Sequence, residues 1–221
     1  MVGCITVGRI ANRNELISDD DFSDCKSKMK PKVGIIGRGS VGSSIQSGLD
    51  KGGYATRIVG SDPKGVSETA KWADIVILAV PFAAIDDALK AMGNSINGKA
   101  LIDASNIVGP DAQQKIPATS SGAKELQRKA SSAKVVKAFN TIFAEQMATG
   151  HTKGQQISLF VAGDDKEAKA KTLELARDIG FDAIDAGPLD NARYLEAMGN
   201  MMIQLGMRLG MGREVAFKVI H

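Results

Sequence analysis

A glycine-rich turn between an expected strand and an expected helix constrains this chain more than any other feature. Gly37-Arg38-Gly39-Ser40-Val41-Gly42 is a G-x-G-x-x-G motif that directly follows the apolar run Val33–Ile36 and opens the amphipathic segment Ser40–Lys51. The first glycine permits a tight turn, the second lets the backbone approach a pyrophosphate, and the third allows the helix to pack closely on the strand. In this context the motif predicts a dinucleotide site at a helix N-terminus.

Short β-rich runs alternate with helix-length segments from Lys32 onward. Such alternation predicts an α/β fold with a doubly wound, mainly parallel sheet of the Rossmann type and a small C-terminal α/β-helical domain. The expected strands are Val33–Ile36, Ala55–Val59, Ile75–Val80, Ala100–Asp103, Val135–Ala138, Ile157–Ala162 and Ala183–Asp185. The expected helices are Ser40–Lys51, Phe82–Met92, Lys166–Ile179 and residues 191–209, with residues 112–133 as a further candidate.

Three parts are expected along the 221 residues. Residues 1–28 show no sustained period and read as a weakly ordered N-terminal extension, ahead of a second methionine at position 29. Residues 29–150 form the expected dinucleotide-binding domain. Residues 151–221 form the smaller domain, which is expected to supply a substrate pocket and dimer contacts.

Composition narrows the class of protein. The net charge of +3 favours an anionic small molecule over nucleic acid. The longest apolar run, residues 75–85, is too short for a membrane span, which needs about 20 residues. Cys4 and Cys25 cannot make a multi-cysteine scaffold, and His151 and His221 are too few for a histidine-rich metal centre. Without a secretory leader, the expected location is cytoplasmic.

The tip of the second strand bears on the choice between NAD and NADP. An NAD site normally ends this strand with a carboxylate that binds the ribose 2′-hydroxyl. Here Ser61 can donate to a 2′-phosphate, while Lys64 and Arg38 can supply positive charge. Asp62 would repel a phosphate unless it faces solvent or caps the following turn. We therefore predict NADP.

Four further motifs carry a family resemblance. They are Ala79-Val80-Pro81-Phe82, Asp103-Ala104-Ser105-Asn106, Lys137-Ala138-Phe139-Asn140 and Arg193-Tyr194-Leu195-Glu196. In this order, and with the glycine motif, they make residues 32–219 resemble the NADPH-dependent coenzyme F420 reductases. That family also includes the cytosolic domain of six-transmembrane metalloreductases.

The resemblance implies a role for each matching position. The turn Gly37–Gly42 would bind the pyrophosphate, through Arg38, Gly39, Ser40 and Val41. Ser61 and Lys64 would bind the 2′-phosphate. Val80 and Pro81 would line the cofactor ribose, and Ala138 and Asn140 would lie by the nicotinamide. Asp62 and Asn106 complete the expected cofactor-binding set, and Asn106 would also help to wall the pocket of the second partner. Many relatives carry arginine just after the position of Ser61, where this chain has Asp62, so the pattern departs there.

A second redox partner is expected above the nicotinamide, at the carboxyl ends of the strands. Its expected pocket residues are Phe82, Ile107, Met202 and Met207. The C-terminal segment that carries the methionines is also rich in glycine. It is expected to pack as a buried helix against the sheet or a twin subunit, and a homodimer through this segment is compatible with a nearby pocket.

No strong acid–base candidate accompanies the expected nucleotide site, and His151 reads as a loop histidine. Hydride transfer between stacked rings needs no such group, because the rings carry the chemistry. The leading hypothesis is therefore an oxidoreductase that uses NADP(H) and coenzyme F420, with Lys137, Arg193 and Arg208 as candidate cations for the anionic F420 tail. The alternatives are a flavin or ferric reductase that uses FMN or FAD, an imine or pyrroline carboxylate reductase, which would need a longer helical C-terminal half, and a non-enzymatic NADPH sensor.

Overall fold

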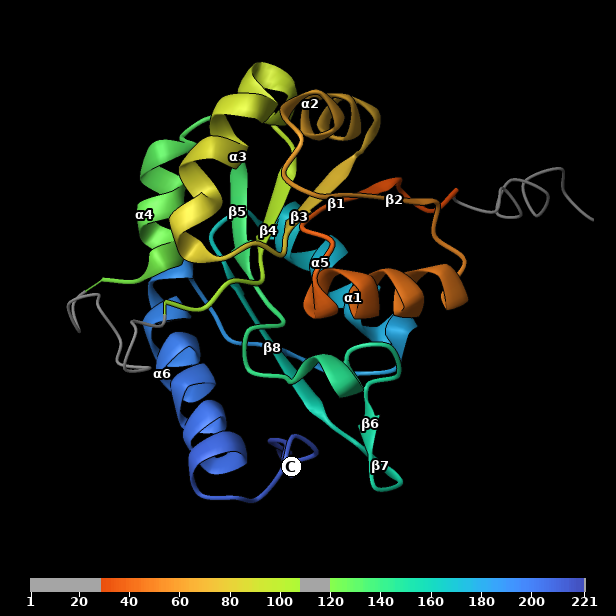
Figure 1. Cartoon of the computed structure of the whole chain (residues 1–221), viewed down its shortest axis with the longest axis vertical. Helices are drawn as coiled ribbons and strands as arrows, with labels where there is room; N and C mark the ends of the chain where they lie inside the picture. The colour runs from red at the N-terminus through yellow and green to blue at the C-terminus, as the bar shows by residue number, and fades with distance from the viewer. Residues whose placement is uncertain (1–28, 108–119, 221) are drawn as a thin grey trace, which may run out of the picture.

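A mostly parallel sheet runs through the centre of the molecule (Figure 1), which is a computed structural model that describes residues 29–107 and 120–220. Among these residues seven strands form the sheet, in the order β2-β1-β3-β4-β5-β8-β9. Their bounds are β1 (Val33–Ile36), β2 (Thr56–Val59), β3 (Ile75–Leu78), β4 (Ala100–Asp103), β5 (Lys134–Lys137), β8 (Ser158–Gly163) and β9 (Asp182–Asp185). Within this seven-stranded sheet only the β5–β8 pair is antiparallel. The expected α/β class is confirmed.

The central strands are buried on both faces, as their uninterrupted apolar sequences predict. Every residue of β1, β3 and β4 is buried. Ile35 and Ile77 belong to one hydrophobic core, whereas Ile36 and Leu78 belong to a second core on the opposite face. The sheet therefore has a packed core on each side.

Helices cover both faces of the sheet, which makes the fold doubly wound. α1 (Ser40–Lys51) and α5 (Lys166–Ile179) contribute to one core. α2 (Pro63–Trp72), α3 (Ile85–Met92) and α4 (Gly122–Lys129) contribute to the other. α6 (Ala192–Ile203) continues into the π-helical segment η6 (Gln204–Arg208) and runs away from the sheet at the lower left of Figure 1. None of the helices in residues 29–107 and 120–220 is long and apolar enough to cross a membrane.

Short elements complete the described chain. These are the 3₁₀ turns η2 (Phe82–Ala84), η3 (Gly93–Ile96), η4 (Ala144–Gln146) and η5 (Leu189–Asn191), and a hairpin of β6 (His151–Thr152) and β7 (Gln155–Gln156). After η6 the chain turns back, and Ser158 donates its backbone N–H to the carbonyl of Phe217 at 3.0 Å. The C-terminal segment is thereby held against the start of β8.

The structure differs from the sequence expectations at identifiable points. The segment 82–92 begins as the 3₁₀ turn η2 before α3, and α2 was not expected, because its glycine, serine and threonine residues are weak helix formers. The sheet continues across residue 150, because β8 pairs with β5, and the expected division of the chain at that residue stays a prediction. The expected N-terminal extension, Cys4 and Cys25, and residues 112–119 of the candidate helix lie outside the described residues.

Candidate active site

The glycine turn between β1 and α1 has the geometry that its motif predicts. Gly37 has a φ of 117°, and a Cβ there would lie 2.2 Å from the carbonyl oxygen of Ala79. A Cβ on Gly42 would lie 1.9 Å from the carbonyl oxygen of Gly37. At Gly39, in contrast, a Cβ would meet nothing within 4 Å. The outer glycines are therefore required by packing, whereas the middle one faces open space.

The N-terminus of α1 offers uncapped backbone N–H groups at this open space. Its N-cap residue, Gly39, supplies no side-chain hydrogen bond. The partial positive charge of a helix N-terminus then favours an anion at this end. Arg38 reaches toward β2 and donates from Nη2 to the carbonyl of Ile58 at 3.3 Å. A cradle for a phosphate group is thus built from backbone, with one cation beside it.

A cavity of about 500 Å³ lies at the carboxyl end of β2 and is walled by α2 and α3. Its lining residues are Ile36, Gly60, Ser61, Pro63, Val66, Val80, Ala84, Asp87, Ala88, Lys90 and Ala91. Ser61 and Val80 therefore line the same cavity. Lys64 is not in the lining, and its side chain is 84% exposed beside Glu68. Lys90 was missed, because its position opposite β2 depends on how α3 packs.

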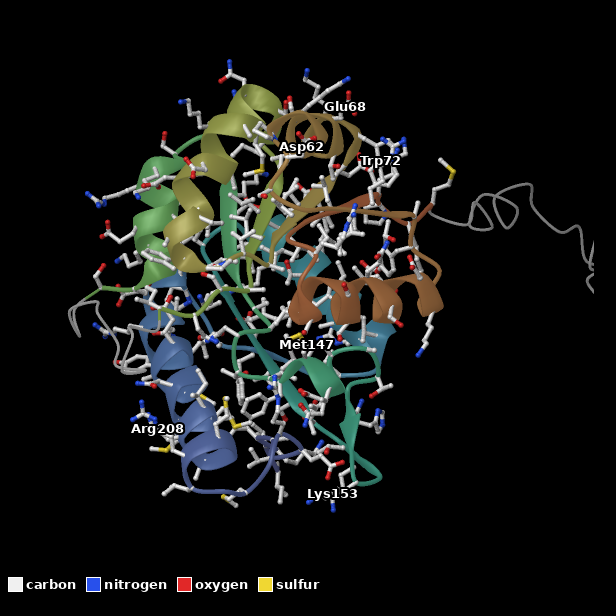
Figure 2. All side chains as sticks on the ribbon, viewed as in Figure 1. Asp62, Glu68, Trp72, Met147, Lys153 and Arg208 are labelled. Atoms are coloured by element: carbon white, nitrogen blue, oxygen red, sulfur yellow. The ribbon has the colours of Figure 1, made fainter. Side chains whose placement is uncertain are left out.

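Asp62 is the N-cap of α2. Its Oδ2 accepts a hydrogen bond from the backbone N–H of Gly65 at 2.7 Å, and Pro63 occupies the first turn. Figure 2 shows Asp62 and Glu68 near α2, at the top of the molecule. The capping role that the sequence left open for Asp62 is confirmed.

Two asparagines from neighbouring strand ends form a reciprocal pair. Asn106 Nδ2 donates to the backbone carbonyl of Asn140 at 2.8 Å, and Asn140 Nδ2 donates to Asn106 Oδ1 at 3.0 Å. Asn140 Nδ2 also donates to the carbonyl of Leu195 in α6 at 2.8 Å. Phe139, just before Asn140, has a φ of 67°, in the left-handed region that L-residues rarely adopt. The pair links β4, β5 and α6.

One acceptor of this pair is unused. Asn140 is 4% exposed, and its Oδ1 has no hydrogen-bond partner among the described residues. A buried acceptor without a partner is energetically costly, at about 1–3 kcal/mol. An amide N–H of a bound molecule is a group that could satisfy it.

A pocket of about 240 Å³ connects the asparagine pair to α1 and α6. Its lining residues are Ser40, Val41, Asn106, Asn140, Ile142, Phe143, Ala144, Gly199, Met202, Ile203, Met207 and Arg213. The pocket thus joins the phosphate cradle to the asparagine pair and includes two of the expected pocket residues, Met202 and Met207.

Other predicted residues do not line this pocket. Phe82 and Ile107 meet at Gly122, where a Cβ would lie 3.0 Å from the Phe82 ring and 2.4 Å from Ile107 Cδ1. Pro81 is exposed at the start of η2, and Ala138 is fully buried in the core. Met201 and Met211 are 53% and 58% exposed, so in this single chain the methionine-rich segment is only partly buried.

Lys137 is not the surface cation that the sequence suggested. Its side chain is fully buried, with Nζ 2.9 Å from Asp103 Oδ2 and 3.1 Å from Glu196 Oε1. Burial alone would lower the pKa of Lys137, but the attraction of Asp103 and Glu196 outweighs it and raises the pKa. We call Lys137, Asp103 and Glu196 the buried charge cluster. Because it is enclosed, Lys137 cannot reach the tail of a ligand.

The remaining candidates are peripheral. Arg193 lies 3.6 Å from Asp190, and Arg208 is exposed on η6, at the opposite end of the view from Asp62 (Figure 2). His151 is exposed, as expected, but it lies in the short strand β6 and not in a loop. Within residues 29–107 and 120–220, no group of three or more His, Cys, Asp or Glu side chains could hold a metal ion.

Comparisons with known proteins point to one group of redox proteins. A family described as NADP oxidoreductase, coenzyme F420-dependent, matches residues 64–107. The F420-dependent NADP reductase of Methanocaldococcus jannaschii is 28% identical over 166 residues, which are 72% of this chain and 73% of that protein. A crystal structure from Arthrobacter sp. FB24, described as an F420-dependent NADP reductase, has a TM-score of 0.79 and 28% identity, and the match covers 86% of this chain and all of that one.

A second kind of relative is larger. The metalloreductase STEAP3 of Rattus norvegicus is 31% identical over 201 residues, which are 86% of this chain. The chain spans 40% of the length of that protein. The resemblance found in the motifs thus extends to both kinds of protein.

Proposed function

We propose that this chain, which is similar to the coenzyme F420-dependent NADP oxidoreductases, transfers hydride between NADP(H) and the deazaflavin coenzyme F420. One observation carries the proposal. A single pocket includes both Ser40, at the anion-binding start of α1, and Asn140, with its unpaired acceptor. This layout matches a dinucleotide that runs from the glycine turn to the edge of β5 and presents its nicotinamide there.

The residues present fit NADP. The open space at Gly39 and the α1 N-terminus would hold the pyrophosphate, and the 500 Å³ cavity with Ser61 would take the adenosine end. Arg38, beside the phosphate cradle, and Lys90, in the lining of that cavity, would supply positive charge for a 2′-phosphate. Asn140 Oδ1 would accept a hydrogen bond from the nicotinamide carboxamide.

Hydride transfer between two rings requires the protein mainly to align the rings. With both redox molecules bound, the net exchange is F420H2 plus NADP⁺ to F420, NADPH and a proton, or the reverse. Met202 and Ile203 give the pocket an apolar wall. Lys137 donates to Asp103, to Glu196 and to the carbonyl of Ser105, so it has no free proton to give. The site therefore acts by positioning two rings.

Absorbance of the deazaflavin tests the proposal directly. Purified protein with NADPH and oxidised F420 should bleach the deazaflavin at a rate that saturates with each substrate. Parallel reactions with NADH should be slower. Asn140→Ala should lower the rate, whereas exposed Met29→Ala, remote from the pocket, is the matched control. If the wild type binds NADPH and leaves F420 unreduced under all conditions, the proposal fails.

The similarity to STEAP3 supports a second candidate, reduction of FMN, FAD or ferric iron by NADPH. The same assay with free flavin or a ferric chelate in place of F420 distinguishes it, because only the second candidate predicts turnover there and none with F420. Tight NADPH binding without reduction of any acceptor would instead favour a nucleotide sensor.

The proposal includes a homodimer. Tyr194, Met201, Met207, Leu209 and Met211 are each more than half exposed on or next to α6 and η6. A second subunit that covers this apolar surface would also close the pocket edge at Met207.

A further inference from the structure

The buried charge cluster takes no part in the proposed function, although it lies against the site. Asp103 and Lys137 end β4 and β5, and Glu196 lies in the first turns of α6. All three side chains are at most 1% exposed. Burying three charges is costly, and such groups contribute little net stability. A role other than stability is therefore worth seeking.

Every member of the cluster is hydrogen-bonded. Asp103 Oδ1 accepts from the backbone N–H and hydroxyl of Ser105 at 2.9 and 2.6 Å. Glu196 accepts from the backbone N–H groups of Gly122 and Ala123 at the start of α4, at 3.0 and 3.2 Å. One ammonium group thus faces two carboxylates, so the cluster has one excess negative charge. The α4 N-terminus offsets only part of it.

The cluster is one residue away from the asparagine pair on both sides. Ser105, whose carbonyl accepts from Lys137 at 2.6 Å, precedes Asn106. Leu195, whose carbonyl accepts from Asn140, precedes Glu196. One turn further along α6, a Cβ on Gly199 would lie 2.6 Å from Asn106 Oδ1, so the helix rests directly on the pair. The excess charge therefore lies close to the pocket, in a region closed to water.

We propose that Glu196, together with Asp103, is a positioning residue that favours the oxidised nicotinamide over the reduced one. This inference rests on the proposed NADP site. An oxidised nicotinamide ring is cationic and a reduced one is neutral, while the rest of the dinucleotide is unchanged. The excess negative charge, which lies next to the asparagine pair, acts on that difference through an effective dielectric constant of about 20. The cluster thereby lowers the reduction potential of the bound couple.

Dissociation constants for NADP⁺ and NADPH, measured by calorimetry on the full chain, test the inference without turnover. Glu196→Gln should weaken NADP⁺ binding relative to NADPH binding by roughly ten- to twentyfold, the effect of one charge about 10 Å away at an effective dielectric constant of about 20. A tenfold change in this ratio corresponds to about 30 mV in the potential of a two-electron couple. Asp103→Asn removes the other carboxylate and should shift the ratio in the same direction.

Asp190→Asn is the matched control, because Asp190 also pairs with a lysine, Lys124 at 2.7 Å, but is 44% exposed. The ratio of the NADP⁺ and NADPH dissociation constants of Asp190→Asn should stay within about twofold of the wild-type ratio, since exposed charges are screened. Equal weakening of both nucleotides in Glu196→Gln would mean a purely structural role and would overturn the inference.

Wild-type binding decides the matter if neither variant folds. The inference requires wild-type protein to bind NADP⁺ at least as tightly as NADPH, and tenfold tighter binding of NADPH would overturn it. Failure of the wild type to bind either nucleotide would refute the proposed function itself. If the ratio of the NADP⁺ and NADPH dissociation constants shifts as expected in the variants but F420 is not reduced, the role of the cluster stands and only the choice of acceptor is refuted.

Discussion

At the scale of single residues, two glycines in one turn should respond differently to the same change. A Cβ at Gly39 meets nothing within 4 Å, and its φ of −77° suits any residue. Gly39→Ala should therefore change the free energy of unfolding by less than about 1 kcal/mol. It should weaken NADPH binding at least tenfold, because the added methyl occupies the space proposed for the pyrophosphate. Denaturant unfolding and calorimetry measure the two effects.

Gly42→Ala is the counterpart. Its Cβ would lie 1.9 Å from a backbone carbonyl, so β1 and α1 must separate. We expect a loss of about 1–3 kcal/mol of stability, the usual range for overpacking. Normal NADPH affinity in a folded Gly39→Ala protein would contradict the assignment of the cradle.

Asp62 has two effects that substitution can separate. Asp62→Ala removes the α2 cap and should cost about 1 kcal/mol of stability. Asp62→Asn keeps a capping oxygen but removes a negative charge near Ser61, so it should leave stability unchanged and tighten NADPH binding several-fold relative to NADH. An unchanged ratio of NADPH to NADH affinity in Asp62→Asn would mean that Asp62 does not act on the 2′-phosphate.

At the scale of elements, local patterns were sufficient where they were strong. The periodic segments Ser40–Lys51 and Lys166–Ile179 are helices with the expected bounds, and the strand runs agree to within two residues. α2 could have been found from Asp62 and Pro63, since a capping residue followed by proline is a helix start signal. The weak helix propensity of the residues inside α2 is why the helix was not expected from the sequence.

The candidate site was harder to predict than the fold, for a physical reason. The glycine turn is local, and sequence alone describes it. The asparagine pair and the buried charge cluster instead join residues far apart in the chain, such as Lys137 and Glu196. A lysine that ends a strand reads as a surface cation until α4 and α6 are placed over it. Burial and partners, which only the fold supplies, reverse that interpretation.

The packing of η6 gives a prediction about the second substrate. A Cβ on Gly206 would lie 2.6 Å from the ring of Phe143, which is itself buried. Gly206→Ala should therefore displace η6 with Met207 from the pocket. We expect a KM for the redox acceptor raised several-fold, with the Kd of NADPH unchanged, measured by steady-state kinetics and calorimetry.

Gly60→Ala is the converse control, because Gly60 lines the 500 Å³ cavity and its Cβ would meet nothing within 4 Å. Gly60→Ala should leave the KM for the acceptor unchanged and change only the Kd of NADPH. If Gly206→Ala changed the Kd of NADPH and left the KM for the acceptor unchanged, the acceptor would not lie at η6.

At the scale of the whole molecule, the exposed apolar side chains of α6 and η6 predict a dimer. In light scattering after gel filtration, the wild type should have twice the 23.3 kDa mass of one chain. Met201→Lys places a charge on the 53% exposed Met201 and should yield monomers, because an uncompensated charge at an apolar interface is costly to desolvate.

Met29→Lys is the control for the added charge alone, since Met29 is 91% exposed and precedes β1, away from α6. The Met29→Lys protein should remain a dimer. Since Met207 lines the pocket and also lies on the exposed apolar surface, the Met201→Lys monomer should in addition reduce F420 more slowly while binding NADPH normally. A wild type that stays monomeric at micromolar concentrations would refute the dimer. The pocket edge at Met207 would then be open to solvent, and the acceptor would have to be held by one chain alone.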